Sequence, residues 1–230
     1  MPLVYPIFYK RKESKMNNHS PNPKKILEAQ DVTAQAEKLS DRARSTFDLI
    51  VKTAHDSFAE NGYELTSIKD IATRANLSVG LIYKYFSNKE ELYRYIVFNE
   101  QQAIKNYVNS HLKNCSSRIE YEKEGLRAWL HYVLENPNVY KLIWESLFFD
   151  KASFDEYYHS FAWSYRKALA NCEDELTIED VKNLAYIIIG ANTFLGVRII
   201  MAHSITDEEI DQMVETFGQV ALNGFLKNDK

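Results

Sequence analysis

The sequence is poor in cysteine, glycine and proline. Its 230 residues include only 2 cysteines, 7 glycines and 5 prolines. Cys115 and Cys172 are too few for a disulfide framework and show no metal-ligand spacing, so we expect a cytoplasmic protein with reduced thiols. The shortage of glycine and proline leaves few residues that break helices. Long uninterrupted elements are therefore expected.

Motifs typical of enzymes and metal sites are also missing. The sequence has no G-x-S-x-G, no paired cysteine motif, no phosphate-binding loop and no H-E-x-x-H. His131, His159 and His203 do not have the spacing of a metal site. We therefore predict that the protein is not an enzyme and uses neither a metal nor another cofactor.

Nothing in the sequence indicates secretion or membrane insertion. The opening MPLVYPIFYKRK places apolar residues before the charges, which is the reverse of a secretory signal. The longest apolar run, residues 184–202, approaches the length of a membrane span but contains Asn192 and Arg198. We expect this run to form a buried helix and the protein to have no membrane partner.

The small net charge of −4 conceals an uneven distribution. Residues 1–95 contain 15 Lys and Arg against 12 Asp and Glu, whereas the rest of the chain contains 13 against 20. Only the N-terminal part leans towards a polyanionic partner, and too weakly to indicate nucleic-acid binding by itself. We expect residues 1–40 to form a flexible basic arm with a short helix at most, and Met16 is an alternative start.

Helical periodicity is abundant. After Ser40 the apolar residues recur in steps of three and four along one amphipathic helix, and Asn61-Gly62 ends it, with Gly62 as a left-handed cap. T-x-x-D and T-x-x-E patterns at Thr177 and Thr206 indicate two later helix starts. Strand-like alternation is absent, so an all-α fold is predicted. Further helices are expected at residues 89–111, 118–134, 138–149, 153–170, 181–202 and 206–226.

Residues 66–92 predict two short helices joined by a tight turn. The apolar residues Ile68, Ile71, Ala72 and Ala75 lie on one face of the first helix. Asn76, which tolerates a left-handed backbone, would form the turn. Ser78 would cap the second helix, and a capping box from Ser87 to Glu90 would start the next. This is a helix-turn-helix, whose second helix enters the DNA major groove.

The order of a capped helix, a helix-turn-helix and an all-helical C-terminal part resembles the tetracycline-repressor (TetR)/AcrR family of transcriptional regulators. The family usually has glycine where this chain has Asn76. The resemblance implies a helix-turn-helix DNA-binding domain at residues 41–88 and a helical-bundle domain for ligand binding and dimerisation at residues 89–230. It covers residues 42–96 and rests on Phe58 with Gly62, Thr66-Ser67-Ile68, Ile71-Ala72, Ser78, Gly80-Leu81-Ile82-Tyr83, Tyr85-Phe86 and Lys89-Glu90-Glu91-Leu92.

The resemblance also implies DNA-contacting roles for nine residues. Thr66 and Ser67 would offer hydroxyl and backbone N–H donors to a phosphate at a helix N-terminus, and Lys89 would pair with another phosphate. Tyr83 and Tyr85 would offer hydroxyls to the DNA backbone, although core packing is an equal alternative for both. The nine residues are Thr66, Ser67, Ser78, Val79, Gly80, Tyr83, Lys84, Tyr85 and Lys89.

A single recognition helix binds weakly, so such modules act as twofold homodimers with recognition helices about 34–36 Å apart on a palindromic operator. We expect the last two helices to supply the dimer surface. Gly190, Gly196 and Gly218 lie inside them, where each costs about 1 kcal/mol relative to alanine. Close helix approach would offset this cost, either between two subunits or within one.

Aromatic residues crowd the C-terminal part, which can mean either plain core or a ligand site. The resemblance favours a site for a small hydrophobic or amphipathic effector. Arg198 lies among valine and isoleucine, so if buried it would need an anionic partner. That partner could be the carboxylate or phosphate of the effector, or an internal acid such as Glu145. The candidate effector-binding residues are Trp129, Trp144, Phe148, Trp163 and Arg198.

These features predict a dimeric, sequence-specific DNA-binding transcriptional regulator, namely a repressor that an effector releases from its operator. The helix expected at residues 89–111 would link the two domains. The alternative is a helix-turn-helix protein that acts without a small ligand, through a protein partner or as a DNA organiser. A closed aromatic cavity in the C-terminal part would favour the ligand-controlled regulator.

Overall fold

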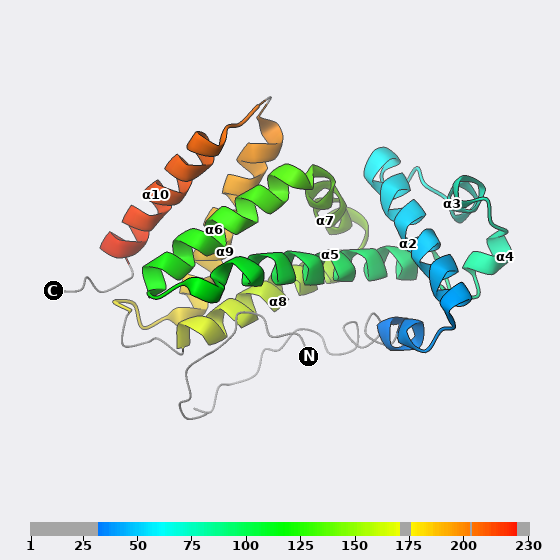
Figure 1. The fold of residues 1–230 in the computed structure, drawn as a ribbon, viewed down its shortest axis with the longest axis horizontal. Coiled ribbons are helices and arrows are strands. Elements are labelled where there is room, and N and C mark those ends of the chain that lie inside the picture. Colours follow the sequence, from blue (N-terminus) through cyan, green and yellow to red (C-terminus); the bar gives the residue numbers. More distant parts are fainter. Residues whose placement is uncertain (1–31, 171–175, 203, 225–230) are drawn as a thin grey trace. The chain divides into compact units, whose positions relative to one another are not determined.

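The structure is a computed structural model that describes residues 32–170, 176–202 and 204–224. Most of the predicted arm, residues 1–31, lies outside the described residues, as do Cys172 and His203. A short helical segment at residues 32–37 comes first. The later elements are α2 (Asp41–Asn61), α3 (Ile68–Ala75), α4 (Val79–Ile82), α5 (Lys89–His111), the 3-10 helix η1 (Leu112–Asn114), α6 (Arg118–Glu135), α7 (Pro137–Phe149), α8 (Lys151–Ala170), α9 (Val181–Met201) and α10 (Asp207–Gly224) (Figure 1).

The all-α fold is confirmed, and the predicted helices are all present. α5 has the predicted bounds, and the other predicted bounds are met within two residues. The end of α2 follows the expected mechanism, because Gly62 has φ 84° and its N–H donates to the Phe58 carbonyl. Its ψ of 166° lies outside the left-handed helical region, in a region that only glycine adopts freely.

The start of α5 differs from the prediction. Instead of a capping box between Ser87 and Glu90, the side chain of Asn88 accepts a hydrogen bond of 2.8 Å from the Glu91 N–H. The Glu91 carboxylate accepts in turn from the Ser87 N–H. Glu90 pairs with Arg94 one turn further on. Asparagine caps helices as well as serine does, and Glu90 has a cationic partner on its own helix, so the cap lies one residue later.

The last two helices also have side-chain caps. At α10 the predicted box forms, since the Thr206 hydroxyl accepts from the Glu209 N–H at 3.3 Å and the Glu209 carboxylate accepts from the Thr206 N–H at 2.9 Å. At α9 the cap is Asp180 itself, which accepts from the Asn183 N–H at 3.1 Å. The Thr177 hydroxyl, predicted to belong to this cap, instead donates to the Gly224 carbonyl.

The described chain divides into two compact units. The N-terminal unit holds residues 32–101 and 138–157, and the C-terminal unit holds residues 102–137 and the described part of 158–224. α5 and α8 are each continuous helices with residues in both units. Residues 138–157 thus pack with the N-terminal helices, although the predicted functional boundary at residue 88 assigned them elsewhere; that boundary stays a prediction.

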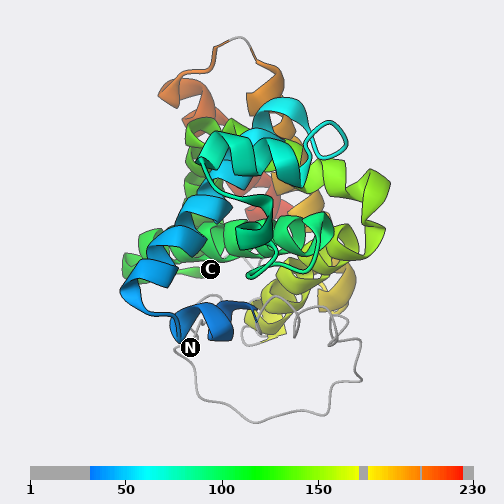
Figure 2. The same cartoon turned by 90° about the vertical axis from the view of Figure 1, so that its right-hand side faces the viewer.

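In the N-terminal unit, α3 packs against α2, and α4 packs against α3 (Figures 1 and 2). α3 buries the face that the sequence predicted. Phe86, which follows α4, is almost fully buried and stacks on Phe47 of α2 with ring centroids 5.3 Å apart. Tyr95 of α5 meets the Phe47 ring edge-on at 5.3 Å. These rings fix the helix-turn-helix to its two supporting helices.

α7 packs on the opposite end of this unit, beside the loop that follows α2. The ring of Phe149 stacks on Tyr63 at 3.6 Å, and Tyr93 of α5 meets Phe149 edge-on at 4.9 Å. Lys141 of α7 donates to the Ala59 carbonyl at the end of α2 at 2.6 Å. α7 therefore caps the C-terminal carbonyls of α2, where a cation is electrostatically favourable.

In the C-terminal unit, α6 packs against both α9 and α10. The indole N–H of Trp129 donates to the Asn192 carbonyl at 3.1 Å, which joins α6 to α9. Ion pairs from Lys123 to Glu215 and from Arg127 to Asp211 join α6 to α10. The core is aliphatic and includes Leu112, Leu126, Leu130, Val133, Leu169, Leu184, Ile188, Ile210 and Val214.

α9 is not the buried helix that the sequence predicted. By length and composition α9 could cross a membrane. In the structure, 33% of its most apolar stretch is buried within the chain. Ile187, Phe194 and Met201 are 67%, 69% and 78% exposed. Their spacing of seven residues places them in one row along the helix. An exposed apolar row on a long helix needs a partner surface, because large apolar patches are rare on isolated soluble chains.

Candidate nucleic-acid interface

The turn between α3 and α4 has the predicted geometry. Asn76 adopts φ 54° and ψ 43°, the left-handed conformation, and is the only non-glycine residue with positive φ in the part of the chain that the structure describes. The N–H of Leu77 donates to the Ala72 carbonyl at 2.9 Å. Ser78 then caps α4, accepting from the Leu81 N–H. Asparagine therefore does here what glycine usually does in such a turn.

The short helix α4 presents an open surface. Its cap and first two residues, Ser78 to Gly80, are exposed, and so are Tyr83 and Lys84 just after the helix. Tyr83 is 51% exposed, so the predicted alternative of core packing does not apply to it. A side chain at Gly80 would meet no atom within 4 Å, which leaves the backbone of α4 accessible to a partner surface.

The Thr66 hydroxyl does not have the predicted position. Thr66 is only 2% exposed, and its hydroxyl lies within 2.8 Å of the Gly62 carbonyl and 3.1 Å of the Ser57 carbonyl. The prediction of a phosphate contact by this hydroxyl is therefore corrected. Helix ends leave carbonyls without partners, and the threonine hydroxyl serves those at the end of α2.

Ser67 is exposed at the N-terminus of α3, but it takes part in a capping box. The Ser67 hydroxyl accepts from the Asp70 N–H, and the Asp70 carboxylate accepts from the Ser67 N–H at 2.9 Å. The hydrogen bond from the Ser67 hydroxyl also holds the pKa of Asp70 below its ordinary value. An anionic carboxylate thus occupies part of the site where a phosphate was predicted to bind.

Two further residues that were predicted to contact DNA form hydrogen bonds within the N-terminal unit instead. The Lys89 ammonium donates to the carbonyls of Tyr63 at 2.8 Å and Thr66 at 3.1 Å, and it lies 4.1 Å from the centre of the Tyr63 ring. The half-buried Tyr85 donates its hydroxyl to the Ala43 carbonyl of α2. Lys89 therefore ties the start of α5 to the loop before α3, and Tyr85 ties the helix-turn-helix to α2.

The charges around this surface are partly neutralised. Arg74 of α3 forms a bidentate pair with Glu60 of α2, with nitrogen to oxygen distances of 2.6 and 2.7 Å. Hydrogen bonding from Arg74 holds the pKa of Glu60 below its ordinary value. Lys84 is exposed and forms no ion pair with any described residue. Among the predicted cations, Lys84 is the one available for a phosphate.

Comparison with known proteins agrees with this geometry. The sequence profile of "Bacterial regulatory proteins, tetR family" matches residues 50–96, the segment from the middle of α2 into α5. Residues 50–96 of the chain therefore form a tetR-family segment. Members of this family are transcriptional regulators rather than enzymes, so the matched segment is that of a DNA-binding regulator of transcription.

The tetR-family relatives match beyond the DNA-binding segment. The "Probable acrEF/envCD operon repressor" of Escherichia coli K12 is 26% identical over 126 residues, which are 53% of this chain and 54% of that protein, so this chain spans about half the length of that curated relative. A solved tetR-family regulator from Pectobacterium atrosepticum has a TM-score of 0.64 with 19% identity, covering 84% of this chain and all of that one. The fatty acid degradation regulator FadR from Bacillus halodurans has a TM-score of 0.60 with 17% identity, covering 81% and 97%.

The predicted effector-binding residues belong to both units: Trp144 and Phe148 lie in the N-terminal unit, and Trp129, Trp163 and Arg198 lie in the C-terminal unit. Arg198 is exposed, so the premise of a buried guanidinium is wrong. It lies one turn from Phe194 and Met201, in the exposed row of α9. Phe148 is 85% exposed and lines no enclosed site. Glu145, the suggested internal partner of Arg198, accepts instead from the Tyr63 N–H at 3.0 Å.

The three tryptophans have separate surroundings. The indole N–H of Trp129 is satisfied by the Asn192 carbonyl, and the Lys167 ammonium lies 3.7 Å above the Trp163 ring. Trp144 of α7 packs edge-on against Phe154, and its buried indole N–H has no hydrogen-bond partner among the described residues. Trp144 thus has a buried donor that no described residue uses.

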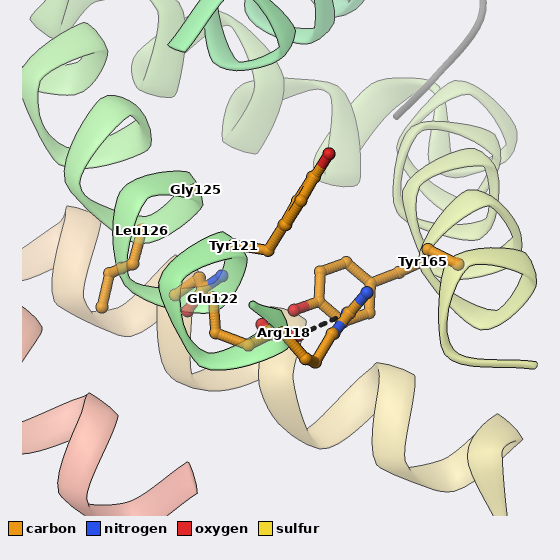
Figure 3. A pocket seen from close by; sticks show the side chains of 8 residues that line it. Arg118, Tyr121, Glu122, Gly125, Leu126 and Tyr165 are labelled. Carbon is orange, nitrogen blue, oxygen red and sulfur yellow. Dashed lines mark hydrogen bonds and ion pairs between the residues drawn. The ribbon is translucent and has the colours of Figure 1, made fainter. Parts of the chain in front are cut away.

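The C-terminal unit contains a small polar cavity that the sequence did not predict (Figure 3). It has a volume of about 10 Å³, enough for roughly one water molecule, and lies among α6, α8 and α9. Arg118 forms a buried ion pair with Glu122 beside it, and burial raises the pKa of the Glu122 carboxyl. The ring of Tyr165 lies 5.6 Å from the Arg118 guanidinium. The spacing of arginine and glutamate four residues apart on a predicted helix was the available signal.

Proposed function

We propose that the protein is a homodimeric, sequence-specific DNA-binding regulator that represses transcription until a small effector releases it. The observation that carries this proposal is the exposed surface of Ser78, Val79, Gly80, Tyr83 and Lys84, presented by a capped turn in a chain of the tetR family. The relative named as an operon repressor supports the sign of regulation. Most contacts from this surface would position the protein, and few would read bases.

The exposed row of α9 supports dimerisation. Ile187, Phe194 and Met201 would be covered by the same row of a second copy, as in isologous twofold interfaces. Gly190 lies within this stretch and has no atom within 4 Å of its missing side chain, so a partner helix could approach it closely. At Gly218 the close neighbour is Lys123 of α6, so its packing is within one subunit. Gly196 is buried, and we retain it as a candidate.

α5 supports a route from effector to DNA. It is one continuous helix, and its first residue, Lys89, donates to two carbonyls, of Tyr63 and Thr66, in the loop that precedes α3. A ligand that favours one tilt of α5 would therefore displace the helix-turn-helix. Binding of the effector would then weaken binding of the operator, and binding of the operator would weaken binding of the effector, typically by 1–3 kcal/mol.

The effector class we propose is small and hydrophobic or amphipathic. The unpartnered indole N–H of Trp144 supports a ligand with a polar group. The resemblance in fold to a regulator of fatty acid degradation supports an aliphatic ligand. The alternative is a regulator without a small ligand, and the small volume of the polar cavity beside Arg118 and Glu122 favours it.

The DNA-binding proposal is tested by fluorescence anisotropy with duplexes from the upstream region of the protein's own gene. Lys84→Gln should weaken binding and reduce the slope of log K against log salt by about one per half-site, because one phosphate contact is lost. Tyr83→Phe should weaken binding several-fold without changing this slope.

Lys113→Gln is the matched control, since Lys113 is an exposed lysine of η1 outside the helix-turn-helix. An equal salt slope for Lys84→Gln and Lys113→Gln would remove Lys84 from the interface. No binding by the unmodified protein to any upstream duplex at moderate salt would reject the proposed function.

A further inference from the structure

Lys105 of α5 is a buried cation in the C-terminal unit. It is 7% exposed and lies on the same side of the helix as the buried Ile104 and Val108. Its ammonium donates to the Ser160 hydroxyl of α8 at 2.8 Å and lies 5.1 Å from the centre of the Phe161 ring. No carboxylate among the described residues pairs with it. A neutral hydroxyl and a ring face compensate only part of the cost of burying a charge.

A half-buried cation of the same unit, Arg118, has different surroundings. Arg118 has the buried carboxylate of Glu122 as an ion-pair partner. Burial lowers the pKa of Lys105 to about 8, and no nearby anion offsets this effect. Lys105 thus has no anionic partner among the described residues, and an external anion could be that partner.

We propose that Lys105 and Ser160 form an internal anchor for the carboxylate head of an aliphatic effector. This inference rests on the proposed function, because it assigns the effector's charge and the residues that hold it. The ammonium and the hydroxyl are both donors and lie 2.8 Å apart, so each can serve one oxygen of a single carboxylate. Phe161 provides an apolar surface beside them for the start of the aliphatic chain.

The charge balance favours a monoanion. One ammonium neutralises one carboxylate, whereas a phosphate ester carries close to two negative charges at neutral pH and would keep one of them buried without a partner. In the effector complex the ammonium would be fully paired. The Ser160 hydroxyl, which accepts a hydrogen bond from Lys105 in this structure, would rotate and donate to the ligand.

The test is isothermal titration calorimetry of the full chain with octanoate, dodecanoate and hexadecanoate, and with dodecan-1-ol and dodecyl phosphate. The unmodified protein should bind dodecanoate at least ten-fold more tightly than dodecan-1-ol. Lys105→Met should abolish this preference while leaving the affinity for the alcohol nearly unchanged, because methionine keeps the apolar stem. Ser160→Ala should reduce it several-fold, and Lys105→Arg should retain part of it.

Lys113→Met is the control for loss of a lysine at an exposed site in the same unit. Above about pH 8 the affinity of the unmodified protein for dodecanoate should fall by up to ten-fold per pH unit, because the neutral amine no longer attracts the anion. Lys105→Met should show no such fall. Circular dichroism of each variant would establish that it is folded.

Three results would overturn the assignment: no binding of any of the three fatty acids, an unchanged preference in folded Lys105→Met, or tighter binding of dodecyl phosphate than of dodecanoate. Operator binding without ligand is measured separately and tests the DNA-binding proposal by itself. If dodecanoate bound through Lys105 without weakening operator binding, the anchor would stand and release by this effector class would be rejected.

Discussion

At the scale of single residues, Gly62 is the position where backbone geometry is most demanding. Its φ of 84° and ψ of 166° suit glycine alone, and an added Cβ would lie 2.6 Å from the Glu145 carboxylate that accepts from the Tyr63 N–H. Gly62→Ala should therefore destabilise the protein by about 1–3 kcal/mol, measured by urea unfolding.

Gly80→Ala is the matched control, because Gly80 lies in a helix with open space around it. It should leave stability unchanged or raise it by up to about 1 kcal/mol, while weakening operator binding if α4 approaches the bases closely. Equal losses of stability for the two variants would contradict the geometry at Gly62.

Lys105 makes the second residue-scale prediction, on the pH dependence of stability. Its folded pKa of about 8 lies below the ordinary 10.5, so between these values the unfolded chain binds the proton and the folded chain does not. Stability should therefore rise from pH 8 to pH 10.5, by at most roughly 3 kcal/mol from this group. Below pH 8 the cost of the buried charge is fully present, so Lys105→Met should be more stable than the unmodified protein at pH 7.

The measurement is the difference in unfolding free energy between Lys105→Met and the unmodified protein at several pH values. This difference should shrink as the pH rises through the interval. A difference that stays constant would mean that Lys105 keeps its ordinary pKa in the folded state.

At the scale of elements, the loop from α2 to α3 sets the position of the helix-turn-helix. Thr66 serves carbonyls at the end of α2, and Lys89 donates to the Tyr63 and Thr66 carbonyls within this loop. α7 adds Lys141 and Glu145 from the other side. The loop and the end of α2 are therefore held by Thr66 of the loop itself and by side chains from two helices, α5 and α7, and none of these contacts uses the proposed DNA-facing surface.

Thr66→Val tests this role. It keeps the shape of the side chain but removes the hydroxyl that donates to the Gly62 carbonyl, so it should destabilise the protein by about 1–3 kcal/mol. Thr66→Ser keeps the hydroxyl and should cost less. If Thr66→Val weakened operator binding at full stability, the original prediction of a phosphate contact would be restored.

At the scale of the whole molecule, the proposed dimer depends on the exposed row of α9. Phe194→Asp places a charge in the middle of an apolar surface, so it should shift the protein from dimer to monomer in sedimentation equilibrium. It should also weaken operator binding, because two linked half-sites bind far more tightly than one.

Asn106→Asp adds the same charge at an exposed position of α5 and should leave the protein dimeric. A monomeric unmodified protein would contradict the proposed interface. A Phe194→Asp variant that remains dimeric would show that the dimer uses another surface.

The sequence by itself determined the local features. The bounds of α5, the caps at Ser78 and Thr206 and the left-handed turn at Asn76 were all predictable, because each depends on contacts within about four residues along the chain. The apolar face of α3 followed from the helical period for the same reason.

The tertiary structure alone decided which side chains are covered and by what. Thr66 and Lys89 turn to carbonyls of neighbouring segments, Arg198 faces outward, and Lys105 faces inward. Periodicity marks an apolar face but does not show whether the chain itself covers it, so the prediction that α9 is buried was wrong. A polar group's role depends on the partners that packing brings to it, and these partners lie far away in the sequence.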